Sequence, residues 1–254
     1  MNATTSTAIG AAASTTGAPP IAVAQPLPLD VFALDAALRR TEPQKIIEIA
    51  LALFPGRIAA VSSFGTESVV LLHLIAQVNP ATAVVFLDTG HLFPETLAYR
   101  DQLTELLGLT QVLTVTPDPA ALAARDAGNG LWADDPDTCC ALRKVEPLAR
   151  ALSPYSAWIN GRKRYQAQTR STIPVVEGDG ARVKFNPLAT MAREDLLAYM
   201  EQHKLPHHPL EKHGFLSIGC MPCTSRVKPG EDPRAGRWRG RAKTECGIHL
   251  GEGI

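Results

Sequence analysis

Short, continuous apolar runs alternate along the chain with longer segments in which apolar residues recur at helical spacing. Such runs predict strands of a parallel sheet that is covered on both faces. Helices can begin at Asp30, a capping residue, and at Pro94, which suits a first helical turn. The pattern predicts helices over residues 30–38, 43–54, 69–75, 94–107 and 193–203, another beginning near residue 119, and strands over 57–63, 82–88, 111–116, 157–160 and 182–186.

The order of these elements predicts the fold class. Strand and helix alternate, which is typical of a doubly wound α/β fold with a mostly parallel sheet. After about Lys204 the chain is rich in Gly, Pro, Cys and Arg and has little regular pattern, so we expect it to lie over the active site. We predict a single domain over residues 30–254, with a loop-rich catalytic segment at residues 224–254.

The first residues differ in composition from the rest. Residues 1–29 are rich in Ala, Thr, Ser and Pro and carry no charged side chain, so we expect a disordered tail. They lack the basic start and compact apolar centre of a secretory signal, and they contain none of the Arg of a transit peptide. The expectation is a cytoplasmic protein.

Overall size and charge narrow the function classes. A chain of 254 residues fits one large α/β domain or two small ones. The formal net charge is +0, which argues against a general nucleic-acid binder, because such proteins need a basic surplus. No apolar run approaches the ~18 residues of a membrane span, so we expect no membrane partner.

Four of the five cysteines form two pairs, Cys139-Cys140 and Cys220-x-x-Cys223. Four thiolates from two distant segments can bind Zn or an iron–sulfur cluster. Adjacent cysteines point to different places, which favours a larger cubane with separated iron corners. The alternatives are that Cys139 and Cys140 are ordinary core residues, that the second pair is a redox pair, or that all four form a structural zinc site.

The fifth cysteine, Cys246, lies near the C-terminus. Chain ends are usually exposed, so a buried structural role is unfavourable there. Between Thr224 and Thr244 the sequence has seven basic and two acidic residues. Cations lower a thiol pKa and attract anionic substrates, so the surroundings favour a nucleophile. Without the cysteine, the same charges would indicate only a solvated basic surface.

Two polar turns follow the first two predicted strands. The carboxyl edge of a parallel sheet is where ligands bind, and backbone amides at a helix start favour an anion. Neither turn matches the dinucleotide fingerprint or the phosphate-binding loop that ends in Gly-Lys-Ser/Thr. The candidate nucleotide-binding residues are Ser62, Ser63, Phe64, Gly65, Asp88, Thr89 and Gly90.

A second basic cluster is suited to bind phosphate or sulfate oxygens through forked guanidinium donors. No acidic residue lies between Asn160 and Val176. The cluster consists of Arg162, Lys163, Arg164 and Arg170.

Together these motifs resemble the assimilatory adenylyl-sulfate reductases, relatives of the phosphoadenylyl-sulfate reductases. The resemblance covers about residues 40–250. It rests on Cys139-Cys140 with Arg143-Lys144, on the segment 218–224 (IGCMPCT), on the segment 245–249 (ECGIH) and on the two polar turns. It implies an adenine nucleotide alpha-hydrolase-like, or ATP-pyrophosphatase-like, fold. The cluster cysteines favour the adenylyl-sulfate branch over the phosphoadenylyl-sulfate branch.

The resemblance also implies a cofactor, partners and a mechanism. A 4Fe–4S cluster would be held by Cys139, Cys140, Cys220 and Cys223 and would act structurally and electrostatically. The Cys246 thiolate would attack the terminal sulfur of adenosine 5′-phosphosulfate, and thioredoxin or glutaredoxin would release sulfite. A homo-oligomer is compatible with the sequence. The residues implied to bind substrate are Lys144, Arg170, Arg234, Arg237 and His249, the last of which could instead tune Cys246 or dock the tail.

The sequence is also compatible with two functions other than a reductase. An iron–sulfur tRNA-thiolating enzyme would share the sheet, but its Ser-Gly-Gly-x-Asp-Ser loop would have Phe64 in place of the first Gly here. A non-enzymatic zinc-binding module would leave Cys246 and both polar turns unexplained.

Overall fold

The computed structural model describes Met1 and residues 29–249. The predicted tail therefore lies almost wholly outside the described residues, as do the last five residues of the predicted catalytic segment. Between residues 29 and 249, no helix has the length and apolar character needed to cross a membrane.

A six-stranded sheet with the order β3-β2-β1-β4-β6-β5 forms the centre of the fold. Each neighbouring pair is parallel except the antiparallel hairpin of β5 and β6 at one edge. The first strand therefore lies between β2 and β4, with Val61 beside Val85 on one side and Asn160 on the other. The strands are β1 (Ile58–Val61), β2 (Ala83–Leu87), β3 (Val112–Val115), β4 (Ala157–Asn160), β5 (Val176–Asp179) and β6 (Arg182–Phe185).

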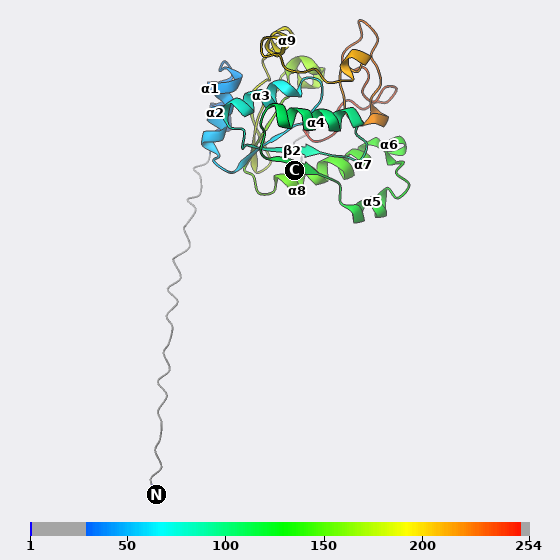
Figure 1. The fold of residues 1–254 in the computed structure, drawn as a ribbon, viewed down its shortest axis with the longest axis horizontal. Helices are drawn as coiled ribbons and strands as arrows, with labels where there is room; N and C mark the ends of the chain where they lie inside the picture. Colours follow the sequence, from blue (N-terminus) through cyan, green and yellow to red (C-terminus); the bar gives the residue numbers. More distant parts are fainter. Residues whose placement is uncertain (2–28, 250–254) are drawn as a thin grey trace.

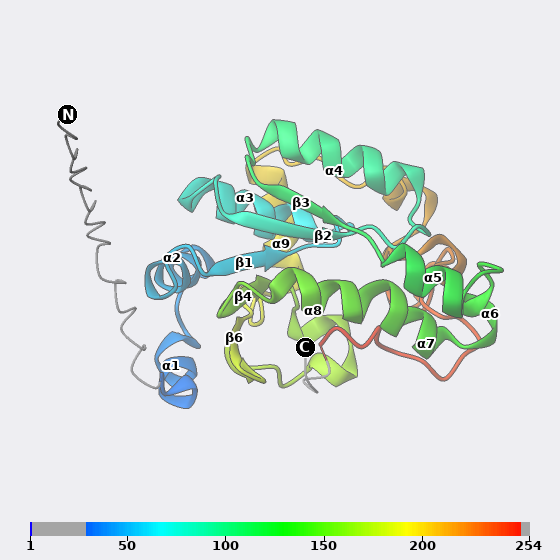
Figure 2. The ribbon, with the colours of Figure 1, turned by 90° about the horizontal axis from the view of Figure 1, so that it is seen from below.

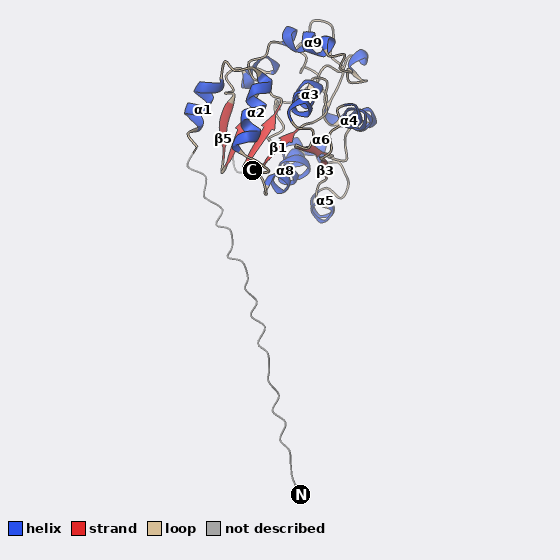
Figure 3. Cartoon of the chain, turned by 60° about the vertical axis from the view of Figure 1, so that its left-hand side comes forward, coloured by secondary structure: helices blue, strands red, loops and turns tan. Residues whose placement is uncertain are grey.

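Helices lie on both faces of this sheet (Figures 1 and 2). In Figure 1, α3, α4 and α9 lie above β2 and α8 lies below it. Figure 3 shows α1 beside β5 at the sheet edge. The helices are α1 (Val31–Leu38), α2 (Pro43–Leu53), α3 (Ser68–Val78), α4 (Pro94–Leu106), α5 (Pro119–Arg125), α6 (Leu131–Asp134), α7 (Pro136–Cys140), α8 (Glu146–Leu152) and α9 (Arg193–Gln202), with a π-helical turn η1 (Ala141–Val145).

Alternate residues of each central strand belong to different cores. Ile58 and Ala60 pack with α2, α3, α4 and α9, whereas Ala59 and Val61 pack with α8. Because successive side chains of a strand point to opposite faces, a strand covered on both sides must be apolar throughout. This is why the continuous apolar runs predicted the central strands, and the predicted doubly wound, mostly parallel fold is confirmed.

The sequence pattern missed β5, and the reason is chemical. The strand reads Val-Glu-Gly-Asp, and both carboxylates pair with cations, the partly exposed Glu177 with Arg162 and the buried Asp179 with Lys184. Asp179 accepts a hydrogen bond from the Trp158 indole at 2.8 Å and lies 3.4 Å from the Lys184 ammonium. Lys184 in turn lies over the Trp158 ring, 4.9 Å from its centroid. A strand stabilised by buried charges lacks the apolar pattern on which the prediction depends.

This buried pair generates a stability prediction. Asp179 and Lys184 are 2% and 1% exposed. Removal of Asp179 leaves Lys184 with only Glu177, 3.6 Å away and partly exposed, and leaves the buried Trp158 indole without its acceptor. We expect Asp179→Ala to lower the free energy of unfolding by about 3–5 kcal/mol, measured by denaturant titration. The double variant Asp179→Asn/Lys184→Met should recover most of that loss, because the Asn side chain keeps an acceptor for the Trp158 indole and no buried cation is left without its partner. A single variant as stable as the unaltered protein would contradict this account.

Candidate active site

The turn after β1 presents its backbone at the carboxyl edge of the sheet. The Ser62 hydroxyl accepts a hydrogen bond from the Phe64 amide at 3.2 Å, and the Ser68 hydroxyl accepts one from the Gly65 amide at 2.9 Å. The Phe64 ring is buried and packs edge-on against Phe86, with ring centroids 5.4 Å apart. This core contact anchors the turn, and Ser62, Ser63 and Gly65 line a pocket above it.

In the turn after β2, one residue lines the pocket and its two neighbours shape the loop. Asp88 accepts a hydrogen bond from the Gly90 amide at 3.0 Å, which closes the turn. Gly90 has a φ of +73°, a conformation that side chains disfavour, and Arg143 lies beside it. Thr89 lines the pocket, and its hydroxyl lies 3.2 Å from the sulfur of Cys220.

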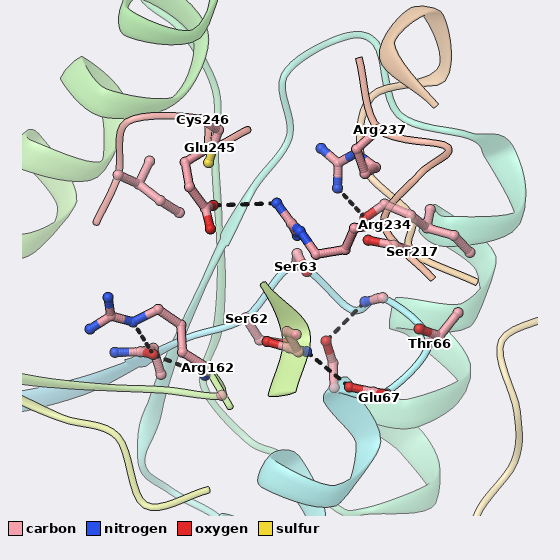
Figure 4. A pocket seen from close by; sticks show the side chains of 18 of the residues that line it. Ser62, Ser63, Thr66, Glu67, Arg162, Ser217, Arg234, Arg237, Glu245 and Cys246 are labelled. Atoms are coloured by element: carbon pink, nitrogen blue, oxygen red, sulfur yellow. Dashed lines mark hydrogen bonds and ion pairs between the residues drawn. The ribbon is translucent and has the colours of Figure 1, made fainter. Parts of the chain in front are cut away.

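The pocket gathers most of the predicted substrate residues (Figure 4). Three of the predicted set do not line it, because the Phe64 ring is in the core and Asp88 and Gly90 shape their turn. The predicted residues that line it are Ser62, Ser63, Gly65, Thr89, Lys144, Arg170, Arg234, Arg237, Cys246 and His249.

The wall of the pocket contains an ion pair that sequence reasoning missed. Glu67 accepts hydrogen bonds from the Lys163 ammonium at 3.0 Å and from the Gln166 amide at 2.9 Å. Burial raises the pKa of the Glu67 carboxyl, but Lys163 and the hydrogen bonds outweigh it, so the pKa lies below its usual value. The partners are far apart in sequence and no local pattern links them.

The four residues of the second basic cluster do not bind one common partner. Arg162 forms an ion pair with Glu177 and donates to the Asn186 side chain at 3.0 Å, while Arg164 donates to the Ile173 carbonyl at 2.9 Å. Arg170 is the member that faces the C-terminal segment. Internal partners therefore account for most of the charge of this cluster.

Arg170 and Arg234 converge on one carboxylate, that of Glu245. Arg170 donates to both Glu245 oxygens, at 2.6 and 2.7 Å, and Arg234 lies 3.4 Å from one of them. Arg234 also donates to the Thr244 carbonyl at 2.7 Å. Figure 4 shows Glu245 directed toward Arg234, with Cys246 beside it.

Arg237 occupies a position that two glycines make available. A side chain at Gly219 would overlap its guanidinium, and one at Gly236 would overlap the Ser225 carbonyl. The guanidinium donates to the Ile218 carbonyl at 3.2 Å and lies over the Trp238 ring, 4.5 Å from its centroid. The Nε donor of Arg237 is buried without a partner among the described residues, so this cation retains capacity to bind an anion.

The segment around Cys246 packs against the face of the sheet that α8 covers. Cys246 is half-buried and lines the pocket. Ile248 packs into the core under α8, and the His249 ring stacks on Trp158 with 5.7 Å between centroids and 4° between planes. Burial and the nearby Arg162 and Arg170 hold the pKa of His249 well below its usual value, so its ring is neutral.

The other four cysteines line a second, smaller pocket. Its lining includes Cys139, Cys140, Cys220 and Cys223, and these cysteines carry free thiols. Across residues 29–249, no group of three or more His, Cys, Asp or Glu side chains is arranged to hold a metal ion. Lys144 and Trp238 line both pockets, so they separate the cysteines from the larger pocket.

Arg143 fixes this arrangement from within the π-helical turn. It is buried, lies 2.6 Å from Asp126 and donates to the Thr89 carbonyl at 2.8 Å and to the Asn129 side chain at 2.7 Å. Such π-helical insertions often occur at functional sites. Here η1 begins directly after Cys140 and carries Arg143 and Lys144.

The sequence and the structure both match known proteins. Residues 57–226 match the phosphoadenosine phosphosulfate reductase domain. A protein of Chelativorans sp. (strain BNC1) named adenosine 5′-phosphosulfate reductase is 52% identical over 89% of this chain and 95% of its own length. One from Gloeobacter violaceus named phosphoadenosine 5′-phosphosulfate reductase is 45% identical over 87% of this chain and 95% of its own length.

Two solved structures are similar in fold. Phosphoadenylyl-sulfate reductase from Candida auris, in a phosphate complex, has a TM-score of 0.66 at 26% identity and covers 78% of this chain and 96% of its own. An FMN adenylyltransferase of Candida glabrata has a TM-score of 0.53 at 15% identity, over 80% of this chain and 69% of its own, and shares the fold alone. The predicted adenine nucleotide alpha-hydrolase-like fold is thereby confirmed, and the chain belongs to the phosphoadenosine phosphosulfate reductase family.

Proposed function

We propose that the protein reduces adenosine 5′-phosphosulfate to sulfite and AMP, with Cys246 as the nucleophile. The observation that carries this proposal is one pocket that is lined by a thiol, by residues of two nucleotide-type turns and by four arginines. The names of several similar bacterial proteins, including those of Chelativorans sp. and Deinococcus radiodurans, support the same substrate.

In this proposal the pocket binds the two ends of the substrate differently. Ser62, Ser63, Gly65 and Thr66 line the pocket beside the start of α3, and we assign this end of the pocket to the nucleotide. Arg170, Arg234, Arg237 and Lys144 supply the cations for the phosphosulfate. A negatively charged sulfuryl group repels a thiolate, so fixed cations are needed to stabilise the transition state.

The first chemical step forms one bond and breaks another. The Cys246 thiolate attacks the sulfuryl sulfur, a sulfur–sulfur bond forms, and the sulfur–oxygen bond to the phosphate breaks. AMP leaves with that electron pair, and S-sulfocysteine remains on Cys246. The half-buried position of Cys246 leaves the thiol accessible to a second reactant.

The second step requires an external dithiol, such as thioredoxin or glutaredoxin. One of its thiolates attacks the Cys246 sulfur, and sulfite departs with the electron pair of the sulfur–sulfur bond. The second thiol of the dithiol then attacks the mixed disulfide and returns Cys246 as a thiolate. Two electrons thus pass from the dithiol to sulfur, which is reduced from sulfate to sulfite.

The donor chemistry of the second pocket fits a 4Fe–4S cluster. Four thiols from two segments line it, and we propose that Cys139, Cys140, Cys220 and Cys223 hold the cluster. When bound, the cluster would cross-link these segments without passing electrons. Burial raises the pKa of the Cys220 thiol, but Lys144 and Thr89 outweigh it and the pKa lies below its usual value.

A second substrate is supported by one specific observation. The Gloeobacter violaceus relative is named for the 3′-phosphorylated compound and is 45% identical to this chain. Phosphoadenylyl-sulfate is therefore the alternative substrate for the same Cys246 chemistry.

The nucleophile is tested by covalent labelling. Anaerobically purified protein incubated with ³⁵S-labelled adenosine 5′-phosphosulfate, without dithiol, should retain label that thioredoxin releases as sulfite. Cys246→Ser should retain none and lose sulfite production by at least about 10³-fold, because the attacking atom is gone. Label only from the 3′-phosphorylated compound would move the protein to the alternative substrate. No label from either compound would refute the proposed function.

The cluster is tested by metal analysis. Cys140→Ser and Cys223→Ser should each lose iron, acid-labile sulfide and activity, because each removes a ligand thiolate. The matched control is Cys246→Ser, which should lose activity but keep iron and sulfide. Zinc without sulfide in the unaltered protein, or a colourless variant with full activity, would contradict a required cluster.

The anion-binding role of Arg237 is tested against a neighbour. Arg237→Ala should lower kcat/KM by about 10²–10³-fold, because one preorganised cation is lost. Arg239 lies in the same segment but pairs with Glu231 at 2.7 Å outside the pocket, so Arg239→Ala should leave kcat/KM unchanged. Equal effects of the two changes on steady-state kinetics would refute the assignment.

A further inference from the structure

Glu245 holds a position that a substrate anion would need. Its carboxylate is bound by Arg170 through both oxygens and by Arg234, and Thr169 lies 3.4 Å away. Glu245 and the Arg170 side chain are each 11% exposed, so water contributes little to this contact. These two arginines belong to the set proposed to hold the phosphosulfate.

The charges explain why some anion must be present there. Burial and the neighbouring Arg170 lower the pKa of Arg234 to about 10, so the two cations disfavour each other. Burial raises the pKa of Glu245, but Arg170 and Arg234 outweigh it, and the carboxyl is ionised. A buried pair of cations without an anion would be costly, and Glu245 removes that cost in the free protein.

We propose that Glu245 is an internal counter-anion, which occupies the phosphosulfate arginines until the substrate anion displaces it. This inference rests on the proposed function and deepens it. The carboxylate and the substrate compete for the same donors, so each substrate molecule must exchange with Glu245 before the adjacent Cys246 can react. After AMP and sulfite leave, Glu245 returns to the arginines.

The segment can make this exchange without leaving the protein. Ile248 and His249 are held by apolar packing and by stacking on Trp158, neither of which requires an anion. Gly247 lies between this anchor and Cys246, and its φ of +91° is a conformation that glycine adopts at little cost. Glu245 can therefore be displaced while residues 248–249 stay docked.

The test measures binding in the cluster-loaded Cys246→Ser protein, in which no turnover occurs. Adding Glu245→Gln removes the competing charge but keeps the shape of the side chain. If Glu245 occupies the arginines about nine-tenths of the time, calorimetry should show about tenfold tighter binding of adenosine 5′-phosphosulfate. Inorganic sulfate, titrated at millimolar concentrations, should also bind more tightly. Adenosine carries no anion and should bind equally to both proteins.

Two further variants control for charge and position. Glu231→Gln removes a carboxylate of the same segment that pairs with Arg239 outside the pocket, and it should change none of these affinities. Glu245→Asp keeps the charge and should retain most of the weaker substrate binding. Unchanged thermal unfolding and iron content would verify that each variant is folded and loaded.

The outcomes separate this inference from the proposed function. Unchanged or weaker binding of adenosine 5′-phosphosulfate after Glu245→Gln would overturn the counter-anion and leave the reductase assignment intact. Failure of every variant to bind that compound would overturn the reductase assignment. In that case the sulfate titration still decides the inference: tighter sulfate binding supports it, and unchanged binding refutes it.

Discussion

The buried ion pair between Arg143 and Asp126 holds the parts of the site together. The same guanidinium binds the Thr89 carbonyl and the Asn129 side chain, so it joins the turn after β2, the loop after α5 and the π-helical turn. A buried charge that loses its partner is strongly destabilising, and this fixes the three segments relative to one another. Cys139 and Cys140 precede the π-helical turn and Lys144 lies within it. One interaction therefore positions two of the proposed cluster ligands and the cation shared by the two pockets.

Three other cations of the pocket differ in the carboxylate that binds them. Lys163 is bound by Glu67 of the pocket wall, and this pair stabilises the wall itself. Arg170 and Arg234 are bound by Glu245, which belongs to the segment that carries the proposed nucleophile. In our proposal, the substrate anion displaces only the second of these carboxylates, Glu245. The ion pairs of Glu245 with Arg170 and Arg234 thus connect the pocket wall to the segment that carries Cys246.

The sequence by itself determined the central part of the fold and the candidate chemistry. A strand covered on both faces must be apolar at every position, so β1 and β2 were readable from continuous runs. The two polar turns could be predicted from the sequence because each directly follows one of these apolar runs. The cysteine pairs and Cys246 stood out because thiols are rare and reactive, and their spacing is a local property of the chain.

The tertiary structure alone decided which residues share a pocket and which charges remain available. Nothing local distinguishes Arg164, which binds the Ile173 carbonyl, from Arg170, which faces Glu245. The pairs Glu67–Lys163 and Arg170–Glu245 join residues separated by long stretches of sequence, so no periodicity encodes them. Phe64 entered the core although its neighbours face the pocket. The physical reason is that Coulomb attraction and packing depend on distance in space, and only the folded chain sets those distances.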